Sequence, residues 1–174
     1  MKIFLIGYMG SGKSTAGKLL ADKLNLSFVD FDKYIEKQTG KTIAEIFDQG
    51  GEEKFRMLEH EHLQQLIPKE KVVISLGGGT PCFYNHMELI NKNGISIYLD
   101  VETDDLVTRL SRARNKRPLI QGLNEVDLRF FVEANLEKRM TYYQQANIII
   151  KSGKKKVEEI TEEMVNALAS LRND

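Results

Sequence analysis

The chain has 174 residues, with 25 basic and 25 acidic side chains and a single cysteine, Cys82. This length predicts one domain, residues 1–174, with a hydrophobic core of its own. The balanced charge and the short apolar runs exclude an electrostatic preference for nucleic acid and a stretch of roughly 20 apolar residues that could cross a bilayer.

The same features set the expected cellular context. A lone cysteine cannot form an internal disulfide, and no Cys/His cluster has zinc-site spacing. The N-terminal apolar run is four residues long, which is too short for a signal peptide. We therefore expect a soluble, cytoplasmic monomer without nucleic-acid or membrane partners.

Short apolar runs alternate with amphipathic helical patterns along the chain. This alternation predicts an α/β fold with a parallel sheet that is covered by helices on both faces. With five strands, it fits a P-loop three-layer sandwich whose ligands bind at the carboxyl ends of the strands. The predicted strands are residues 2–6, 27–29, 71–75, 96–99 and 147–150, and the predicted helices are residues 13–24, 33–39, 43–49, 52–66, 84–92, 103–112, 126–144 and 157–171.

The first predicted strand runs into a glycine-rich loop, Gly7-Tyr8-Met9-Gly10-Ser11-Gly12-Lys13-Ser14, which fits G-x-x-x-x-G-K-S/T. Glycines let backbone N–H groups surround a phosphate, the lysine meets the β and γ phosphates, and the serine hydroxyl can hold Mg²⁺. The alternative is a plain glycine turn with a solvated lysine. The strand before the loop and the helix after it favour a nucleoside triphosphate site formed by Gly10, Ser11, Gly12, Lys13, Ser14 and Thr15.

Two aspartates follow the second predicted strand. Asp30 and Asp32 are two residues apart, so an extended chain would project both to one side, toward the phosphate loop. One carboxylate can hold a Mg²⁺ water while the other orients or deprotonates an acceptor hydroxyl. Alternatively, Asp32 caps a helix that begins at Lys33, and Asp30 is an exposed turn residue.

Arg56 and Glu59 lie three residues apart in a helical pattern that begins after Gly50-Gly51. On one helix face, Glu59 can aim the guanidinium of Arg56 at a substrate anion. The alternative is an exposed ion pair with no further role.

Three consecutive glycines, Gly77-Gly78-Gly79, follow the third predicted strand. Such a run destabilises both helix and strand, so either a close approach of the backbone to a ligand or a sharp turn requires it. Its place at the carboxyl end of a strand favours the ligand.

Four other polar residues carry no predicted chemistry. His60 and His62 have i,i+2 spacing, which separates their rings across a helix, and we expect both, with His86, on solvated helix faces. Asp100 follows the fourth predicted strand, and we expect it to be structural.

A basic segment with Pro118 and Gly122 interrupts the helical pattern after Arg112. Its charge, its length and its low apolar content predict a lid, at about residues 112–124, that closes over the phosphates.

Together these motifs resemble those of the shikimate kinases, which are P-loop small-molecule kinases with a nucleoside-monophosphate-kinase-like fold. The resemblance covers nearly the whole chain and includes a helical substrate-binding region at about residues 33–66. Beyond the phosphate loop it rests on Phe28-x-Asp30-x-Asp32-x-x-Ile35-Glu36, Ile43-x-x-Ile46-Phe47, Gly51-Glu52-x-x-Phe55-Arg56-x-x-Glu59, Gly77-Gly78-Gly79, Arg117-Pro118-Leu119 and Arg139-x-x-x-Tyr143.

The resemblance implies transfer of the γ-phosphoryl group of ATP to the 3-hydroxyl of shikimate, a step of chorismate biosynthesis. It also implies a role for each matching residue. Shikimate would be held by Asp32, Arg56, Gly78 or Gly79, and Arg139, with the two arginines on its carboxylate and Asp32 at the reacting hydroxyl. Mg²⁺ would be served by Ser14 and Asp30, the transferring phosphate by Lys13 and Arg117, and adenine by Arg109 beside the turn that contains Ser152.

The chain departs from the family pattern in two places. It has Thr141-Tyr142-Tyr143-Gln144-Gln145 where relatives often carry Pro-Leu-Tyr-Glu-Glu, which leaves Lys138 as an alternative to Arg139. Arg112 is likewise an alternative to Arg109 at adenine.

Other functions compete with this interpretation. The nearest are a gluconate kinase and a nucleoside monophosphate kinase, and the triple glycine and the Phe-Arg-x-x-Glu motif argue against both. A nucleotide switch is a third alternative, but Asn115-Lys116-Arg117-Pro118 lacks the aspartate of the guanine motif N-K-x-D.

Overall fold

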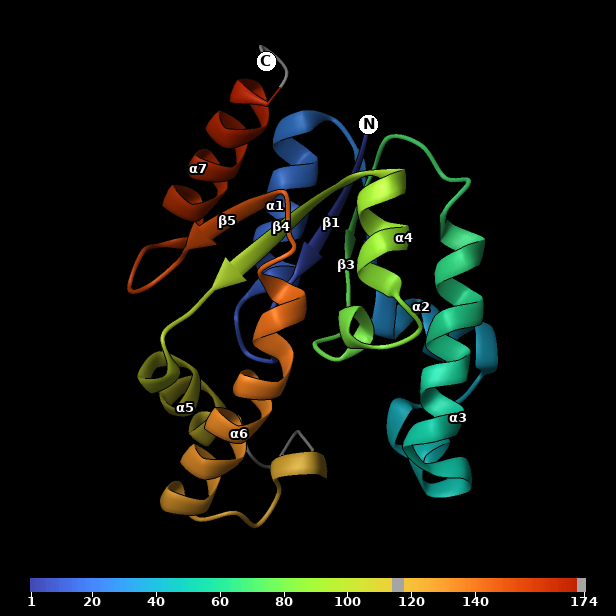
Figure 1. Cartoon of the computed structure of the whole chain (residues 1–174), viewed down its shortest axis with the longest axis vertical. Coiled ribbons are helices and arrows are strands. Elements are labelled where there is room, and N and C mark those ends of the chain that lie inside the picture. The colour runs from blue at the N-terminus through green and yellow to red at the C-terminus, as the bar shows by residue number, and fades with distance from the viewer. Residues whose placement is uncertain (114–117, 172–174) are drawn as a thin grey trace.

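The computed structural model describes residues 1–113 and 118–171. Its centre is one parallel sheet in the order β2-β3-β1-β4-β5 (Figure 1). The phosphate loop therefore leaves from the central strand, with a neighbouring strand end on each side. The strands are β1 (Lys2–Ile6), β2 (Ser27–Asp30), β3 (Val72–Ser75), β4 (Ile95–Asp100) and β5 (Ile148–Lys151).

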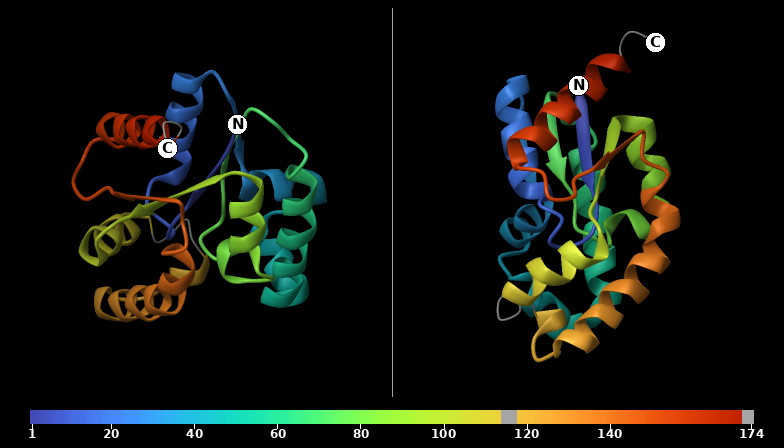
Figure 2. Two further views of the ribbon diagram at one scale, coloured as in Figure 1. Left: turned by 45° about the horizontal axis from the view of Figure 1, so that its top comes forward. Right: turned by 90° about the vertical axis from the view of Figure 1, so that its left-hand side faces the viewer.

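Seven α-helices and two short 3₁₀ helices surround the sheet in the described part of the chain. Helices α1 and α7 lie side by side, as do α5 and α6 (Figure 2). The helices are α1 (Lys13–Leu24), α2 (Phe31–Thr39), α3 (Ile43–Leu66), α4 (His86–Asn93), α5 (Thr103–Arg112), α6 (Glu125–Tyr143) and α7 (Val157–Ser170), with η1 (Thr80–Cys82) and η3 (Pro118–Ile120).

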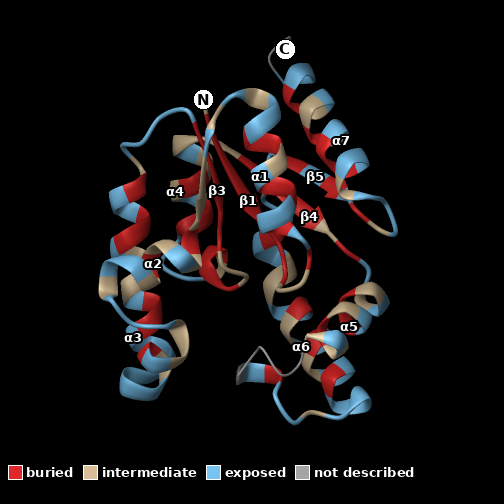
Figure 3. Cartoon of the chain, turned by 180° about the vertical axis from the view of Figure 1, so that it is seen from behind, coloured by how far each residue is buried: buried red, intermediate tan, exposed pale blue. Residues whose placement is uncertain are grey.

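Strand β1 is buried along its whole length and separates two hydrophobic clusters (Figure 3). Ile3 and Leu5 pack in one cluster with residues of α1 and α7. Phe4 and Ile6 pack in the other with residues of α2, α3, α4, α5 and α6. This alternation is the period of an extended strand with both faces covered, and it confirms the predicted three-layer α/β sandwich.

Two helix boundaries differ from the sequence prediction in an informative way. Helix α2 begins at Phe31 because the Asp30 side chain accepts a hydrogen bond from the Lys33 backbone N–H (3.3 Å) and caps the helix. Helix α3 spans both helices predicted at 43–49 and 52–66, and Gly51 (φ 66°, ψ −168°) breaks the helical backbone between them. The predicted interruption was therefore correct.

The predicted lid at residues 112–124 is described only in part, because residues 114–117 lie outside the described residues. Arg112 is the last residue of α5, and Pro118–Ile120 forms η3. Ile120 is fully buried in the cluster that contains Leu128 of α6. The second half of this segment is therefore anchored to the core by Ile120, despite the low apolar content of the segment.

Helices long and apolar enough to cross a membrane are absent from residues 1–113 and 118–171.

Candidate active site

The phosphate loop closes at the carboxyl end of β1 and starts α1. Gly7, Gly10 and Gly12 adopt φ values of 144°, 80° and 91°, which other residues rarely adopt. A Cβ on Gly7 would stand 2.9 Å from the Leu99 carbonyl oxygen. The glycines therefore allow both the loop's shape and its close approach to β4.

Lys13 is buried in this loop. Its ammonium donates hydrogen bonds to the carbonyl oxygens of Gly7 and Tyr8, both at 2.8 Å, and to Ser11 Oγ at 3.3 Å. A solvated lysine on a plain glycine turn does not have these contacts, so the structure excludes that alternative.

Ser14 and Asp30 come together beside the loop. Ser14 Oγ donates to Asp30 Oδ2 at 2.7 Å and lies 3.4 Å from Ser75 Oγ. A hydroxyl and a carboxylate at this distance form a pair of hard oxygen donors of the kind that Mg²⁺ prefers. Both residues line a cavity of about 250 Å³ together with Met9, Gly10, Gly12, Lys13, Thr15, Asp32, Ser75, Leu76, Gly77 and Gly78.

Asp32 faces the same cavity, although not for the predicted reason. The chain is not extended here: Asp30 is the N-cap of α2 and Asp32 lies in the first helical turn, so strand alternation does not align them. The alternative in which Asp32 caps a helix starting at Lys33 is also wrong, because Asp30 is the cap. A helical turn thus brings both carboxylates to one cavity.

The environment of Asp32 favours proton transfer. Its Oδ1 is buried and has no hydrogen-bond partner in the described part of the chain, which is a costly state for a carboxylate. Burial, with the nearby Asp30 carboxylate, raises the pKa of Asp32 above its ordinary value. A carboxylate of raised basicity with one partnerless buried oxygen suits an incoming hydroxyl group.

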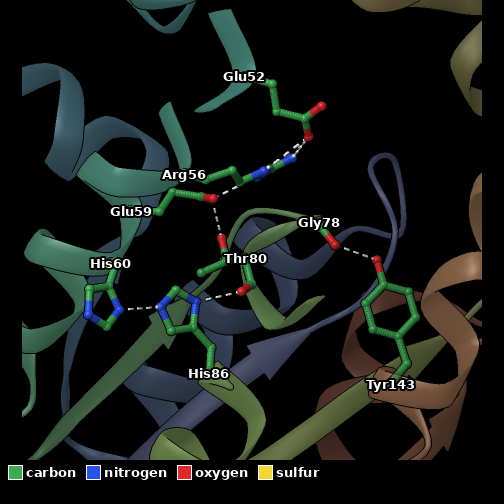
Figure 4. Close-up of polar contacts among 8 residues, drawn as sticks. All are labelled: Glu52, Arg56, Glu59, His60, Gly78, Thr80, His86 and Tyr143. Carbon is green, nitrogen blue, oxygen red and sulfur yellow. Dashed lines mark hydrogen bonds and ion pairs between the residues drawn. The ribbon is translucent and has the colours of Figure 1, made fainter. Parts of the chain in front are cut away.

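Arg56 and Glu59 form a buried ion pair on α3 (Figure 4). Arg56 Nη1 donates to Glu59 Oε2 at 2.6 Å, and the Glu59 side chain is only 1 % exposed. The other oxygen of Glu59 accepts a hydrogen bond from Thr80 Oγ1. Burial excludes the alternative of an exposed pair, and Thr80 fixes the carboxylate that orients the guanidinium.

The triple glycine is required by the side chains of the site. A Cβ on Gly79 would stand 2.4 Å from Arg56 Nη2, and one on Gly77 would stand 2.9 Å from Asp32 Oδ1. On Gly78 it would stand 3.2 Å from Arg139 Nη1. The run is therefore a region of backbone against which three candidate substrate-binding side chains pack.

Two side chains of helix α6 lie beside the backbone of the triple glycine. Arg139 lies with its Cζ 5.3 Å from the ring centroid of Tyr8, whereas Lys138 is exposed. Tyr143, which is fully buried, donates from its hydroxyl to the Gly78 carbonyl oxygen at 2.5 Å (Figure 4). The geometry thus places Arg139, and not its neighbour, beside the glycine run.

The other side of the phosphate loop is bounded by Arg109. Its guanidinium donates to the carbonyl oxygens of Gly10 and Ser11, both at 3.4 Å, and of Gly153 at 3.3 Å. Arg112 is exposed. Arg109 therefore joins the phosphate loop to the turn after β5, while Arg117 lies outside the described residues.

Ser152 donates two hydrogen bonds to the backbone of Asp100. The Asp100 carbonyl oxygen accepts from the backbone N–H of Ser152 at 2.9 Å and from its hydroxyl at 3.3 Å. Ser152 is fully buried. Asp100 thus fixes the turn after β5 through its backbone.

The expectation of solvated histidines is wrong for His62 and His86. His62 is buried, and its Nδ1 lies 2.7 Å from the Leu58 carbonyl oxygen. His86 is fully buried, with Nδ1 2.7 Å from the Thr80 carbonyl oxygen and Nε2 3.0 Å from His60 Nδ1 (Figure 4). The two rings of this pair also stack, with centroids 5.3 Å apart.

Hydrogen bonding assigns the protons in the His60–His86 pair. A carbonyl oxygen only accepts, so His86 Nδ1 donates to Thr80 and a neutral His86 presents Nε2 as an acceptor. His60 Nδ1 then donates to it. The network from Arg56 through Glu59 and Thr80 to this pair has no local sequence signal, because its members come from α3, η1 and α4.

Within residues 1–113 and 118–171, no three His, Cys, Asp or Glu side chains are close enough together to hold a metal ion by themselves.

Comparison with known proteins gives a consistent result. A family model described as shikimate kinase matches residues 9–169. A shikimate kinase of Azobacteroides pseudotrichonymphae is 47% identical over 165 residues, which cover 94% of this chain and 97% of that protein. The crystal structure of a Bacteroides thetaiotaomicron shikimate kinase has a TM-score of 0.92 and 42% identity, covering 97% of this chain and 98% of that one. An Acinetobacter baumannii shikimate kinase in complex with shikimate has a TM-score of 0.91 and 30% identity, covering 99% and 95% of the two chains.

Proposed function

The chain belongs to the shikimate kinase family, and we propose that it uses the site described above to transfer the γ-phosphoryl group of ATP to the 3-hydroxyl of shikimate. The products are shikimate 3-phosphate and ADP. The triple glycine supports this proposal most directly, because Gly77 and Gly78 line the cavity of the phosphate loop, while the run also packs against Arg56 and Arg139. The phosphate donor and the anionic acceptor would thus bind on either side of the triple glycine.

ATP would bind along the phosphate loop. Backbone N–H groups of the loop and the N-terminus of α1 would hold its phosphates. The Lys13 ammonium would give up one of its hydrogen bonds to a loop carbonyl oxygen and donate to a phosphate oxygen instead. Arg109 and the turn after β5 would border the adenine. Because the hydroxyl and the backbone N–H of Ser152 are both bonded to the Asp100 carbonyl oxygen, Ser152 would contribute by fixing the turn beside the adenine.

Mg²⁺ would be held by Ser14 and Asp30. Their oxygen atoms are the hard donors that this ion requires, and phosphate oxygens and water would complete its coordination. When bound, the ion neutralises charge on the β and γ phosphates.

Shikimate would bind between the two arginines and Asp32. Arg56 and Arg139 provide forked donors for its carboxylate, and Asp32 provides an acceptor for the proton of its reacting hydroxyl. Phosphoryl transfer has a loose transition state, so catalysis here would consist of positioning and charge stabilisation, with Arg117 contributing from the lid.

An acceptor screen tests this function. Purified enzyme should release ADP with shikimate and not with gluconate or nucleoside monophosphates in a coupled assay. Turnover with either of the other acceptors at a similar kcat/KM would refute the assignment.

Arg56→Lys tests the carboxylate clamp. Lysine keeps the charge but loses the planar fork, so shikimate affinity should fall by on the order of 2–5 kcal/mol while ATP affinity persists. Unchanged shikimate affinity would remove Arg56 from the acceptor site. We further propose a cytoplasmic monomer, which sedimentation of the purified protein and fractionation of cells would test.

A further inference from the structure

The guanidinium of Arg56 is already bound to a second carboxylate besides that of Glu59. Its Nε and Nη2 atoms both donate to Oε1 of Glu52, at 3.1 Å and 2.9 Å (Figure 4). Its Cζ lies 4.5 Å from the ring centroid of Phe83 and 5.3 Å from that of Phe55. All three nitrogens of the group that would receive the acceptor's carboxylate are thus engaged.

The two glutamates differ in how firmly they are held. The Glu59 side chain is 1 % exposed and has a second hydrogen bond, from Thr80. The Glu52 side chain is 59 % exposed and lies directly after Gly51, where the helical backbone is broken. Glu52 can therefore leave Arg56 and be solvated, whereas Glu59 cannot leave without burying an unpaired charge.

The guanidinium of Arg56 carries one positive charge, and two carboxylates already share it. Glu52 and Glu59 together carry more negative charge than Arg56 neutralises, so an arriving carboxylate would be repelled while both remain. The Nε and Nη2 edge is one that a planar carboxylate can match in bidentate fashion, so Glu52 occupies a preferred binding position.

We propose that Glu52 stands in for the acceptor's carboxylate on Arg56 in the empty site and is displaced when the acceptor binds. The inference rests on the proposed function, in which Arg56 binds that carboxylate. Glu52 keeps the guanidinium paired in the empty site and lowers affinity only for ligands that must displace it. An acceptor with a free carboxylate replaces one ion pair with another, and a neutral analogue leaves Glu52 in place.

Calorimetric dissociation constants for shikimate and its methyl ester test this competition. Glu52→Gln should bind shikimate about 2- to 5-fold more tightly, because the competing ion pair is partly exposed, and should bind the ester as the wild type does. Glu53→Gln is the matched control: it removes the same charge from a neighbouring exposed position and should change nothing.

Each alternative outcome overturns the inference. Weaker shikimate binding by Glu52→Gln would make Glu52 a support for Arg56, and unchanged binding would make the contact irrelevant. Tighter binding by Glu53→Gln as well would reduce the effect to general charge. Failure of the underlying clamp has a different signature, since the wild type would then bind shikimate and its methyl ester equally.

Discussion

Gly79→Ala should weaken the acceptor site by displacing Arg56. Gly79 has φ −90° and ψ −18°, a conformation that alanine adopts without strain, so the added methyl group acts only through its contacts. It would stand 2.4 Å from Arg56 Nη2, where ordinary van der Waals contact starts at 3.4 Å. The guanidinium must therefore move by about 1 Å.

That displacement sets the size of the effect. Arg56 cannot yield freely, because Glu59 holds it at 2.6 Å and the pair is buried. A misplacement of about 1 Å in a substrate-positioning group can cost about 100-fold, or about 2.7 kcal/mol, in kcat/KM. We expect a loss of this size for shikimate with little change in ATP affinity, because Gly79 does not line the phosphate-loop cavity.

Steady-state kinetics in a double-mutant cycle checks the cause. In an Arg56→Ala background the methyl group no longer meets a guanidinium, so Gly79→Ala should add little further loss. The reasoning is refuted if Gly79→Ala leaves kcat/KM for shikimate unchanged, or if its cost is equally large without Arg56.

Four further changes test other parts of the site. Lys13→Ala should nearly abolish turnover at saturating ATP while the protein stays folded by circular dichroism, and retained turnover would contradict the phosphate-loop assignment. Asp32→Asn should lower kcat by about 10²–10⁴-fold with a smaller change in ATP affinity, and equal changes would indicate a metal or folding role. Arg117→Ala should lower kcat more than ATP affinity in steady-state assays if the lid closes on phosphate in the transition state. Burial lowers the pKa of His86, so the unfolded state binds more protons just below its ordinary pKa of about 6.5, and the protein should lose stability as the pH is lowered through this range. Urea titrations should show a smaller fall in His86→Gln, and an identical pH profile would contradict this.

The sequence predicted the fold because strand periodicity and the phosphate loop are local signals. Ile3 and Leu5 face one helical layer and Phe4 and Ile6 the other, as a doubly covered strand requires. The glycine pair before Glu52 also correctly predicted a break in the helical pattern, although the helix continues on both sides of Gly51.

The details of the site depend on tertiary contacts that no local pattern contains. Asp30 could be recognised as a functional residue, but its role as the cap of α2, and hence the helical placement of Asp32, changed the geometric reason for their meeting. The spacing of Arg56 and Glu59 could not distinguish a buried from an exposed pair, because burial is provided by Thr80 and its neighbours. His60 and His86 lie 26 residues apart, so nothing in the sequence indicated that their rings stack.

The triple glycine explains how one short segment can align groups from distant parts of the chain. Gly79 packs against Arg56 from α3, and Gly78 packs against Arg139 from α6 and against the Met9 backbone nitrogen, with a Cβ there only 3.2 Å from both. Tyr143 fixes the same segment by its hydrogen bond to the Gly78 carbonyl oxygen. Two arginines and the phosphate loop are thus positioned against a single stretch of backbone without side chains. A side chain at any of these positions would displace Arg56, Arg139 or Asp32 relative to the phosphate loop. The absence of side chains at the three glycines therefore determines the distance between the bound phosphate donor and the acceptor's carboxylate clamp.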